Sequence, residues 1–224
     1  WAGGPEVSYD SRETLGRLPE LTGVMKGEGE KTFAKLCKVY GKHSETSELS
    51  LEQIDGITFR CPDGTICERP WRVPMDLSEV PFVYHDMKKF ENKIIYYETS
   101  RGCPFSCSYC LSSIDKQLRF RSLDLVFNEL QFFLDHKVPQ VKFVDRTFNC
   151  KHDHAMAIWK YIQEHDNGIT NFHFEVAADL LNDEEIRLIR QMRPGLIQLE
   201  IGVQSTNTDT IREIRRTMRL EEVR

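Results

Sequence analysis

The feature that most constrains this chain is a repeated alternation of strand-like and helix-like segments over residues 91–224. Four apolar segments have the composition of strands, at residues 93–99, 140–145, 172–178 and 196–204. A segment whose apolar residues recur at helical spacing comes after each of them. Alternation of this kind predicts an α/β fold built from parallel βαβ units, in a barrel or in an open sheet.

The ends of the predicted helices carry recognisable residues. Ser122 and Asn182 are expected as N-caps, and Glu185 completes a capping box with Asn182. The last helix is expected to start at Thr208 or Asp209 and to include Met218. Polar residues follow the predicted strands in "VDRTFN", "FEVAAD" and "GVQSTN". Because ligands bind at the carboxyl ends of parallel strands, we expect a site along that rim.

Three cysteines follow the first predicted strand in "SRGCPFSCSYC". Cys103, Cys107 and Cys110 have the spacing C-x3-C-x2-C. Three thiolates can hold three corners of a cubane iron–sulfur cluster, and the uncapped iron can then bind a substrate or a cofactor. A structural zinc ion would need a fourth ligand, from Cys61, Cys67, Cys150 or a histidine. Two hypotheses follow: an enzyme with an open cluster, or a non-catalytic zinc- or cluster-binding module.

This cysteine motif, with the aromatic Tyr109 directly before its last member, resembles the signature of radical S-adenosylmethionine (SAM) enzymes. The resemblance implies a 4Fe–4S cluster whose fourth iron is chelated by the amino and carboxylate groups of SAM. Reductive cleavage of the sulfonium would give a 5′-deoxyadenosyl radical that abstracts hydrogen from a substrate. It also implies an external electron donor such as flavodoxin or ferredoxin. The substrate and any further catalytic residue stay unknown.

The resemblance extends to further residues. Glu175, Gln204 and Arg216 resemble the cofactor-binding trio of oxygen-independent coproporphyrinogen oxidases. Glu175 can accept from an ammonium or ribose hydroxyl, Gln204 can bond polar cofactor atoms, and Arg216 can pair with the carboxylate. The remaining cofactor contacts that the resemblance implies are Asp145 and Thr147 near the amino end, Tyr97 beside the cofactor, and Tyr109 through its backbone to adenine.

The first ninety residues resemble the region that precedes the radical domain in cobalamin-binding relatives. Residues 1–45 are interpreted as the end of a Rossmann-like cobalamin-binding domain, in which Gly3 and Gly4 would let the nucleotide tail of cobalamin lie against the backbone. Residues 46–90 are expected to form a linker with a hairpin, and residues 91–224 the radical SAM domain. The family barrel usually has six βα units, so we expect a partial parallel (β/α) barrel of about four, and a chain cut from a longer one.

Composition excludes other classes. The 224 residues are 40% apolar and 29% charged, with a net charge of −5 and no long basic run, so we expect no nucleic-acid partner. Neither a signal peptide nor an apolar run of ~20 residues is present, so we expect no membrane span. Seven cysteines without a secretory signal indicate a reducing compartment, the cytoplasm. His152 and His154 are expected to be solvated.

Overall fold

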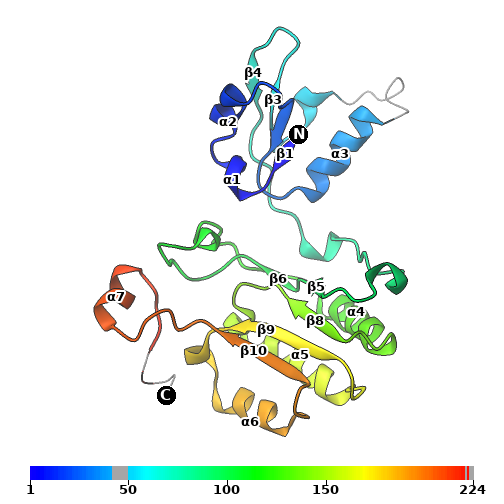
Figure 1. The fold of residues 1–224 in the computed structure, drawn as a ribbon, viewed down its shortest axis with the longest axis vertical. Helices are drawn as coiled ribbons and strands as arrows, with labels where there is room; N and C mark the ends of the chain where they lie inside the picture. Colours follow the sequence, from blue (N-terminus) through cyan, green and yellow to red (C-terminus); the bar gives the residue numbers. More distant parts are fainter. Residues whose placement is uncertain (42–49, 220, 222–224) are drawn as a thin grey trace. The chain divides into compact units, whose positions relative to one another are not determined.

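The computed structural model describes residues 1–41, 50–219 and 221. The chain divides into two compact units, Trp1–Met75 and Asp76–Arg224, and each is described here by itself (Figure 1).

The first unit contains a four-stranded sheet in the order β1-β2-β3-β4. Strands β1 (Ala2–Gly3) and β2 (Gly23–Met25) are parallel, with helices α1 (Pro5–Ser8) and α2 (Ser11–Arg17) between them in the chain. Helix α3 (Glu30–Tyr40) follows β2, and its Leu36 packs on a core that includes Ile54 and Phe59.

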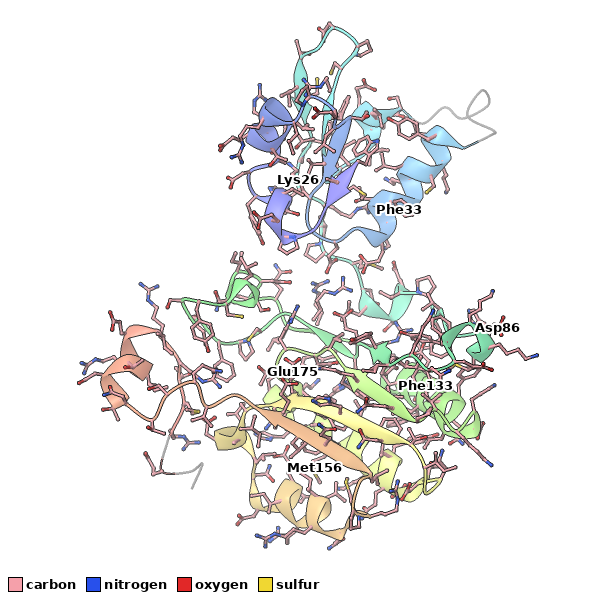
Figure 2. All side chains as sticks on the ribbon, in the orientation of Figure 1. Lys26, Phe33, Asp86, Phe133, Met156 and Glu175 are labelled. Atoms are coloured by element: carbon pink, nitrogen blue, oxygen red, sulfur yellow. The ribbon has the colours of Figure 1, made fainter. Side chains whose placement is uncertain are left out.

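The hairpin that we expected in a linker over residues 46–90 belongs to this first sheet. Strands β3 (Ile57–Arg60) and β4 (Ile66–Glu68) form it, and β3 pairs antiparallel with β2. The fully buried Lys26, labelled in Figure 2, secures the hairpin by donating to Glu68 Oε1 and to the carbonyl oxygen of Arg69, each at 2.7 Å. The compact unit therefore extends to Met75, thirty residues past the boundary expected at residue 45.

The second unit contains four parallel strands in the order β10-β9-β8-β5. They are β5 (Ile95–Tyr97), β8 (Gln140–Phe143), β9 (Asn171–Val176) and β10 (Ile197–Ile201), and the helices are α4 (Leu123–Asp135), α5 (His152–Glu164), α6 (Asp183–Gln191) and α7 (Thr208–Glu213). A short antiparallel pair, β6 (Ser100–Arg101) with β7 (Arg119–Phe120), flanks the cysteine segment. Because the strands are adjacent in chain order and never reverse direction, the sheet is a partial parallel barrel, as predicted.

One face of this sheet packs against the helices. Alternate strand residues are buried in an aromatic core, with Phe143 and Phe174 only 4.4 Å apart between ring centroids, and Trp159 of α5 fully buried beside Phe174. The opposite residues, such as Lys142 and Glu175, lie on the other face. None of the helices in the described ranges is long and apolar enough to cross a membrane.

The predicted helix starts agree with the structure in position, although the Ser122 side chain makes no cap hydrogen bond at the start of α4. The Asn182–Glu185 capping box is confirmed, since the Asn182 side chain accepts from the Glu184 and Glu185 amides and Glu185 accepts from the Asn182 amide. Helix α7, however, ends at Glu213, before the expected Met218. Arg215 is left-handed at φ 55°, and the amide of Arg216 donates to the carbonyl of Ile211 at 3.1 Å. This Schellman turn reverses the chain.

Glycine at position 215 is expected to stabilise the protein. A left-handed conformation costs a side-chain-bearing residue about 1–2 kcal/mol, and glycine escapes most of it. Arg215→Gly should therefore raise the free energy of unfolding, measured in urea, by about 1 kcal/mol. The matched control is Arg212→Gly inside α7, which should lower it by about 1 kcal/mol. A lower stability for Arg215→Gly would contradict the role of the turn.

Candidate functional site

The three cysteines lie on a loop that is held from both sides at the carboxyl end of β5 and β6. Upstream of the loop, Gly102 has φ +96°, and a Cβ there would stand 2.4 Å from the carbonyl oxygen of Gln117. The amide of Cys103 donates to the carbonyl of Asp115 at 3.1 Å. The Lys116 ammonium donates to the carbonyl of Phe105 and, at 2.9 Å, to Ser106 Oγ. The loop is therefore ordered by contacts that leave its thiols free.

All three thiols are unpaired by disulfides. Cys103 and Cys107 are buried, at 8% and 6% exposure, and Cys110 is partly exposed. Over the residues that the structure describes, no three His, Cys, Asp or Glu side chains are gathered as a ligand set for a metal ion. The structure therefore brings the three thiols onto one loop without closing them into a ligand set.

Cys103 lies against the end of β8. Its Sγ is 3.8 Å from Thr147 Oγ1, whose hydroxyl is also 2.8 Å from the carbonyl oxygen of Arg146. Burial, and then the negative charges of Cys103 and Asp145, raise the pKa of the Cys150 thiol to about 11. The Cys150 thiol is therefore protonated near pH 7 when it binds no metal.

Asp145 is fully buried and its carboxylate accepts three hydrogen bonds. The donors are the Thr99 amide at 3.0 Å, the Thr99 hydroxyl at 2.7 Å and the Ser100 hydroxyl at 2.6 Å. Burial raises the pKa of Asp145 to about 6, against the lowering effect of these hydrogen bonds. Asp145 therefore fixes the segment that leads into the cysteine loop.

His154 is not solvated, contrary to expectation. It is 4% exposed, and its Nε2 lies 3.2 Å from the Thr99 hydroxyl. Burial, and then the charge of Lys151, lower the pKa of His154 to about 4. The imidazole is therefore neutral near pH 7. His152 keeps a side chain that is 46% exposed and pairs with Glu185 at 2.9 Å.

Tyr109, Gln204 and Arg216 meet on the far side of the loop. The Tyr109 hydroxyl donates to Gln204 Oε1 at 3.0 Å and accepts from Arg216 Nη1 at 3.1 Å. Arg216 Nη2 also donates to the carbonyl of Gly202. The sequence-predicted Gln204 and Arg216 are thus brought together with the loop residue Tyr109.

A hollow of about 840 Å³ lies beside this group. Phe105 and Ser106 of the cysteine loop, Leu180, Ile211 and Arg216 are among the residues that line it. It is large enough for a ligand of nucleoside size.

Glu175, labelled in Figure 2, lies on the open face of β9 with a different set of partners. Lys142 Nζ is 4.0 Å from Glu175 Oε1 and 3.0 Å from Glu200 Oε2. The hydrogen bond from Lys142 lowers the pKa of Glu200, and the same bond raises the pKa of Lys142. His173 Nε2 lies 3.1 Å from Glu200 Oε2, but without the geometry of a hydrogen bond.

Sequence reasoning missed Lys142, His173 and Glu200. Their sequence pattern could have indicated them, because each alternates with apolar residues along its strand. Together with Glu175 they form a charged layer on the open face.

Three sequence-predicted residues lie apart from these groups. Tyr97 is 5% exposed in the core, where its hydroxyl donates to Glu129 at 2.6 Å, so it does not face the open side of the sheet as expected of a cofactor contact. The neighbouring Tyr96 takes the open face, since strand residues alternate. Gly3 and Gly4 belong to the first unit, at the end of β1 and the start of α1, and Gly4 has φ +101°.

A sequential parallel sheet with three free thiols on the loop after its first strand places the chain in the class of partial (β/α) barrels that carry a cysteine-rich loop at the strand carboxyl ends. Residues 97–224 match the model of the radical SAM superfamily. The chain belongs to that superfamily.

Relatives support this assignment. An uncharacterised methyltransferase, PH0819, of Pyrococcus horikoshii is 30% identical over 202 residues, which are 86% of this chain and 42% of the relative. The anaerobic magnesium-protoporphyrin IX monomethyl ester cyclase of Synechocystis is 27% identical over 227 residues, which are 96% of this chain and 43% of the relative. The chain thus spans less than half the length of these two proteins.

Solved structures share the fold. The cobalamin-dependent SAM radical enzyme OxsB, with aqua-cobalamin and SAM bound, matches 98% of this chain and 33% of its own, with a TM-score of 0.76 and 20% identity. The radical SAM methyltransferase TsrM of Kitasatospora setae, with cobalamin and a 4Fe–4S cluster bound, matches 99% of this chain and 45% of its own, with a TM-score of 0.72 and 16% identity.

Proposed function

We propose that this chain is the core of a radical SAM enzyme that binds a 4Fe–4S cluster through Cys103, Cys107 and Cys110. In the full-length protein it would cleave SAM reductively and use cobalamin for methyl transfer, or for a radical cyclisation or rearrangement. The observation that carries the proposal is the loop that presents three free thiols beside Gln204 and Arg216.

The donor set fits the cluster. The three thiols are soft ligands, and a cubane takes each of them on a separate iron, so they need not share one metal ion. Two of them are shielded from water, and the ammonium of Lys116 on the loop offsets negative charge. A structural zinc would need a fourth ligand in addition to the three thiols.

The chemistry that a bound cluster would supply is one-electron reduction of the sulfonium of SAM, which releases a 5′-deoxyadenosyl radical. Arg216 would pair with the cofactor carboxylate, and Gln204 would bond its polar atoms. Glu175 would accept from an ammonium or a ribose hydroxyl on the open face of the sheet. Asp145 and Thr147 would order the wall behind Cys103, consistent with their buried hydrogen bonds.

Cobalamin is proposed for the first unit. The parallel pair β1–β2 with intervening helices is consistent with the end of a Rossmann-like domain. Gly3 and Gly4, without side chains, would let a nucleotide tail approach the backbone. OxsB and TsrM both contain cobalamin in their structures, and relatives named as methyltransferase and cyclase suggest the two reaction classes.

Two further proposals concern the electron donor and the cellular compartment. An external flavodoxin or ferredoxin would supply the electron, as the reductive step requires. The cytoplasm is the proposed compartment, and the seven cysteines, all free, are consistent with its reducing conditions.

Arg216→Ala is expected to weaken SAM binding. A charge-assisted hydrogen bond contributes about 1.5–3 kcal/mol, so the dissociation constant should rise about 10- to 100-fold. Equilibrium dialysis with the reconstituted full-length protein would measure it, and the iron content should not change.

Arg187→Ala provides the control, because Arg187 is an exposed arginine of α6 that does not line the hollow beside Arg216. It should bind SAM as the wild type does. Unchanged affinity in Arg216→Ala would remove Arg216 from the proposed site.

A further inference from the structure

The Tyr109 hydroxyl joins the cysteine loop to two residues far along the chain. It donates to Gln204 Oε1, 95 residues away, and accepts from Arg216 Nη1, 107 residues away. These bonds occupy the donor and one acceptor position of the hydroxyl. Tyr109 as a whole is 52% exposed. Its position therefore depends on the hydrogen bonds of its hydroxyl more than on hydrophobic packing.

The Arg216 guanidinium depends on Tyr109 for part of its orientation. Nη2 is held by the Gly202 carbonyl and Nη1 by Tyr109, while Nε is buried and finds no partner within the described residues. A buried donor without a partner is costly, and an anionic group would satisfy it. The guanidinium is therefore held at two nitrogens and leaves the third for a ligand.

Local backbone structure brings these groups together. The Schellman turn after α7 places Arg216 behind the left-handed Arg215, and Gln204 is itself left-handed at φ 60°. The Ser108 amide donates to the Ile214 carbonyl at 2.9 Å, which ties the loop to the same turn.

We propose that Tyr109 is a positioning residue whose hydroxyl holds Arg216 and Gln204 ready for the carboxylate of an α-amino acid, here that of SAM. Since Tyr109 lies between Cys107 and Cys110, it couples the order of the metal-binding loop to cofactor affinity. This inference rests on the proposed function. It differs from the backbone contact to adenine that the sequence indicates for Tyr109.

Tyr109→Phe tests the hydroxyl alone. In the reconstituted full-length protein, the dissociation constant for SAM should rise about three- to tenfold, because the variant loses two hydrogen bonds that position Gln204 and Arg216 but do not touch SAM itself. Iron content should stay at the wild-type level. Saturating SAM should restore the wild-type change in the electron paramagnetic resonance spectrum of the reduced cluster, because the hydroxyl sets affinity and not the bound geometry.

The matched control is Tyr161→Phe, which also removes a tyrosine–glutamine hydrogen bond, of 2.9 Å to Gln131, on the helical side of the unit. It should leave SAM affinity unchanged. The double variant Tyr109→Phe with Arg216→Ala should lose less affinity than the sum of the two single losses, since the hydroxyl acts in part through the guanidinium.

Each of the remaining outcomes would contradict either this inference or the proposed cofactor site. The inference would be overturned if Tyr109→Phe bound SAM as tightly as the wild type or more tightly, or if the losses in the double variant were additive. The proposed cofactor site would still stand in that case, provided that Arg216→Ala weakens SAM binding. A loss of iron in Tyr109→Phe would overturn it too, because the hydroxyl would then serve the loop rather than Arg216. If Arg216→Ala also binds SAM normally, the proposed cofactor site itself fails.

Discussion

Alanine at Cys107 is expected to abolish the cluster and every activity that depends on it. Two remaining thiolates cannot hold three corners of a cubane. After anaerobic reconstitution, the wild-type full-length protein should contain about four irons and four sulfides per chain, and Cys107→Ala close to none. Release of 5′-deoxyadenosine from SAM under reducing conditions should disappear with the iron.

Cys150→Ala is the sharpest control for that experiment. Cys150 lies in the same unit, close enough to Cys103 for the two thiols to interact electrostatically, yet it stands outside the C-x3-C-x2-C motif. Its replacement should leave iron and sulfide at wild-type levels. One zinc per chain without sulfide, lost on replacing either Cys107 or Cys150, would instead identify a closed metal site and a non-catalytic module.

The second large effect concerns the pH dependence of stability. Folding raises the pKa of Asp145 from 3.8 to about 6, so this group loses stability as pH rises from about 4 to about 6. Folding lowers the pKa of His154 from 6.5 to about 4, so this group gains stability over nearly the same interval. Each contribution is about 3 kcal/mol, at 1.36 kcal/mol per pKa unit. In the wild type the two largely cancel.

Single variants should separate the two contributions. Relative to the wild type, His154→Gln should lose about 3 kcal/mol of unfolding free energy between pH 4 and pH 6.5, and Asp145→Asn should gain about as much. Urea denaturation at several pH values would measure both. Parallel curves for the wild type and both variants would show that neither group titrates with a shifted pKa.

Local patterns explain why most of the barrel could be predicted. The four strands, the capping box at Asn182 and the rim that carries the cysteine loop all depend on residues close together in sequence. The domain limit near residue 45 depended instead on whether β3 pairs with β2, a contact between segments more than thirty residues apart. Nothing in the hairpin sequence specifies that partner.

Other differences between the expectations from sequence and the structure have equally specific causes. The sequence "IYY" clearly indicates a strand. Whether Tyr96 or Tyr97 faces the helices depends on where those helices pack, so the sequence alone does not show which tyrosine is buried. The end of α7 was missed because the left-handed position is an arginine, where glycine is usual. His154 looked solvated because its burial comes from Thr99 and Phe120, both distant in the chain.

The close approach at Gly102 has a consequence for how this loop tolerates change. Even a single methyl group at that position would collide with the main chain at Gln117, and a non-glycine residue would also resist φ +96°. The backbone on either side would have to separate, and Cys103 would be carried along with it. The position of the Cys103 sulfur therefore depends on residue 102 having no side chain, whether or not a metal is bound.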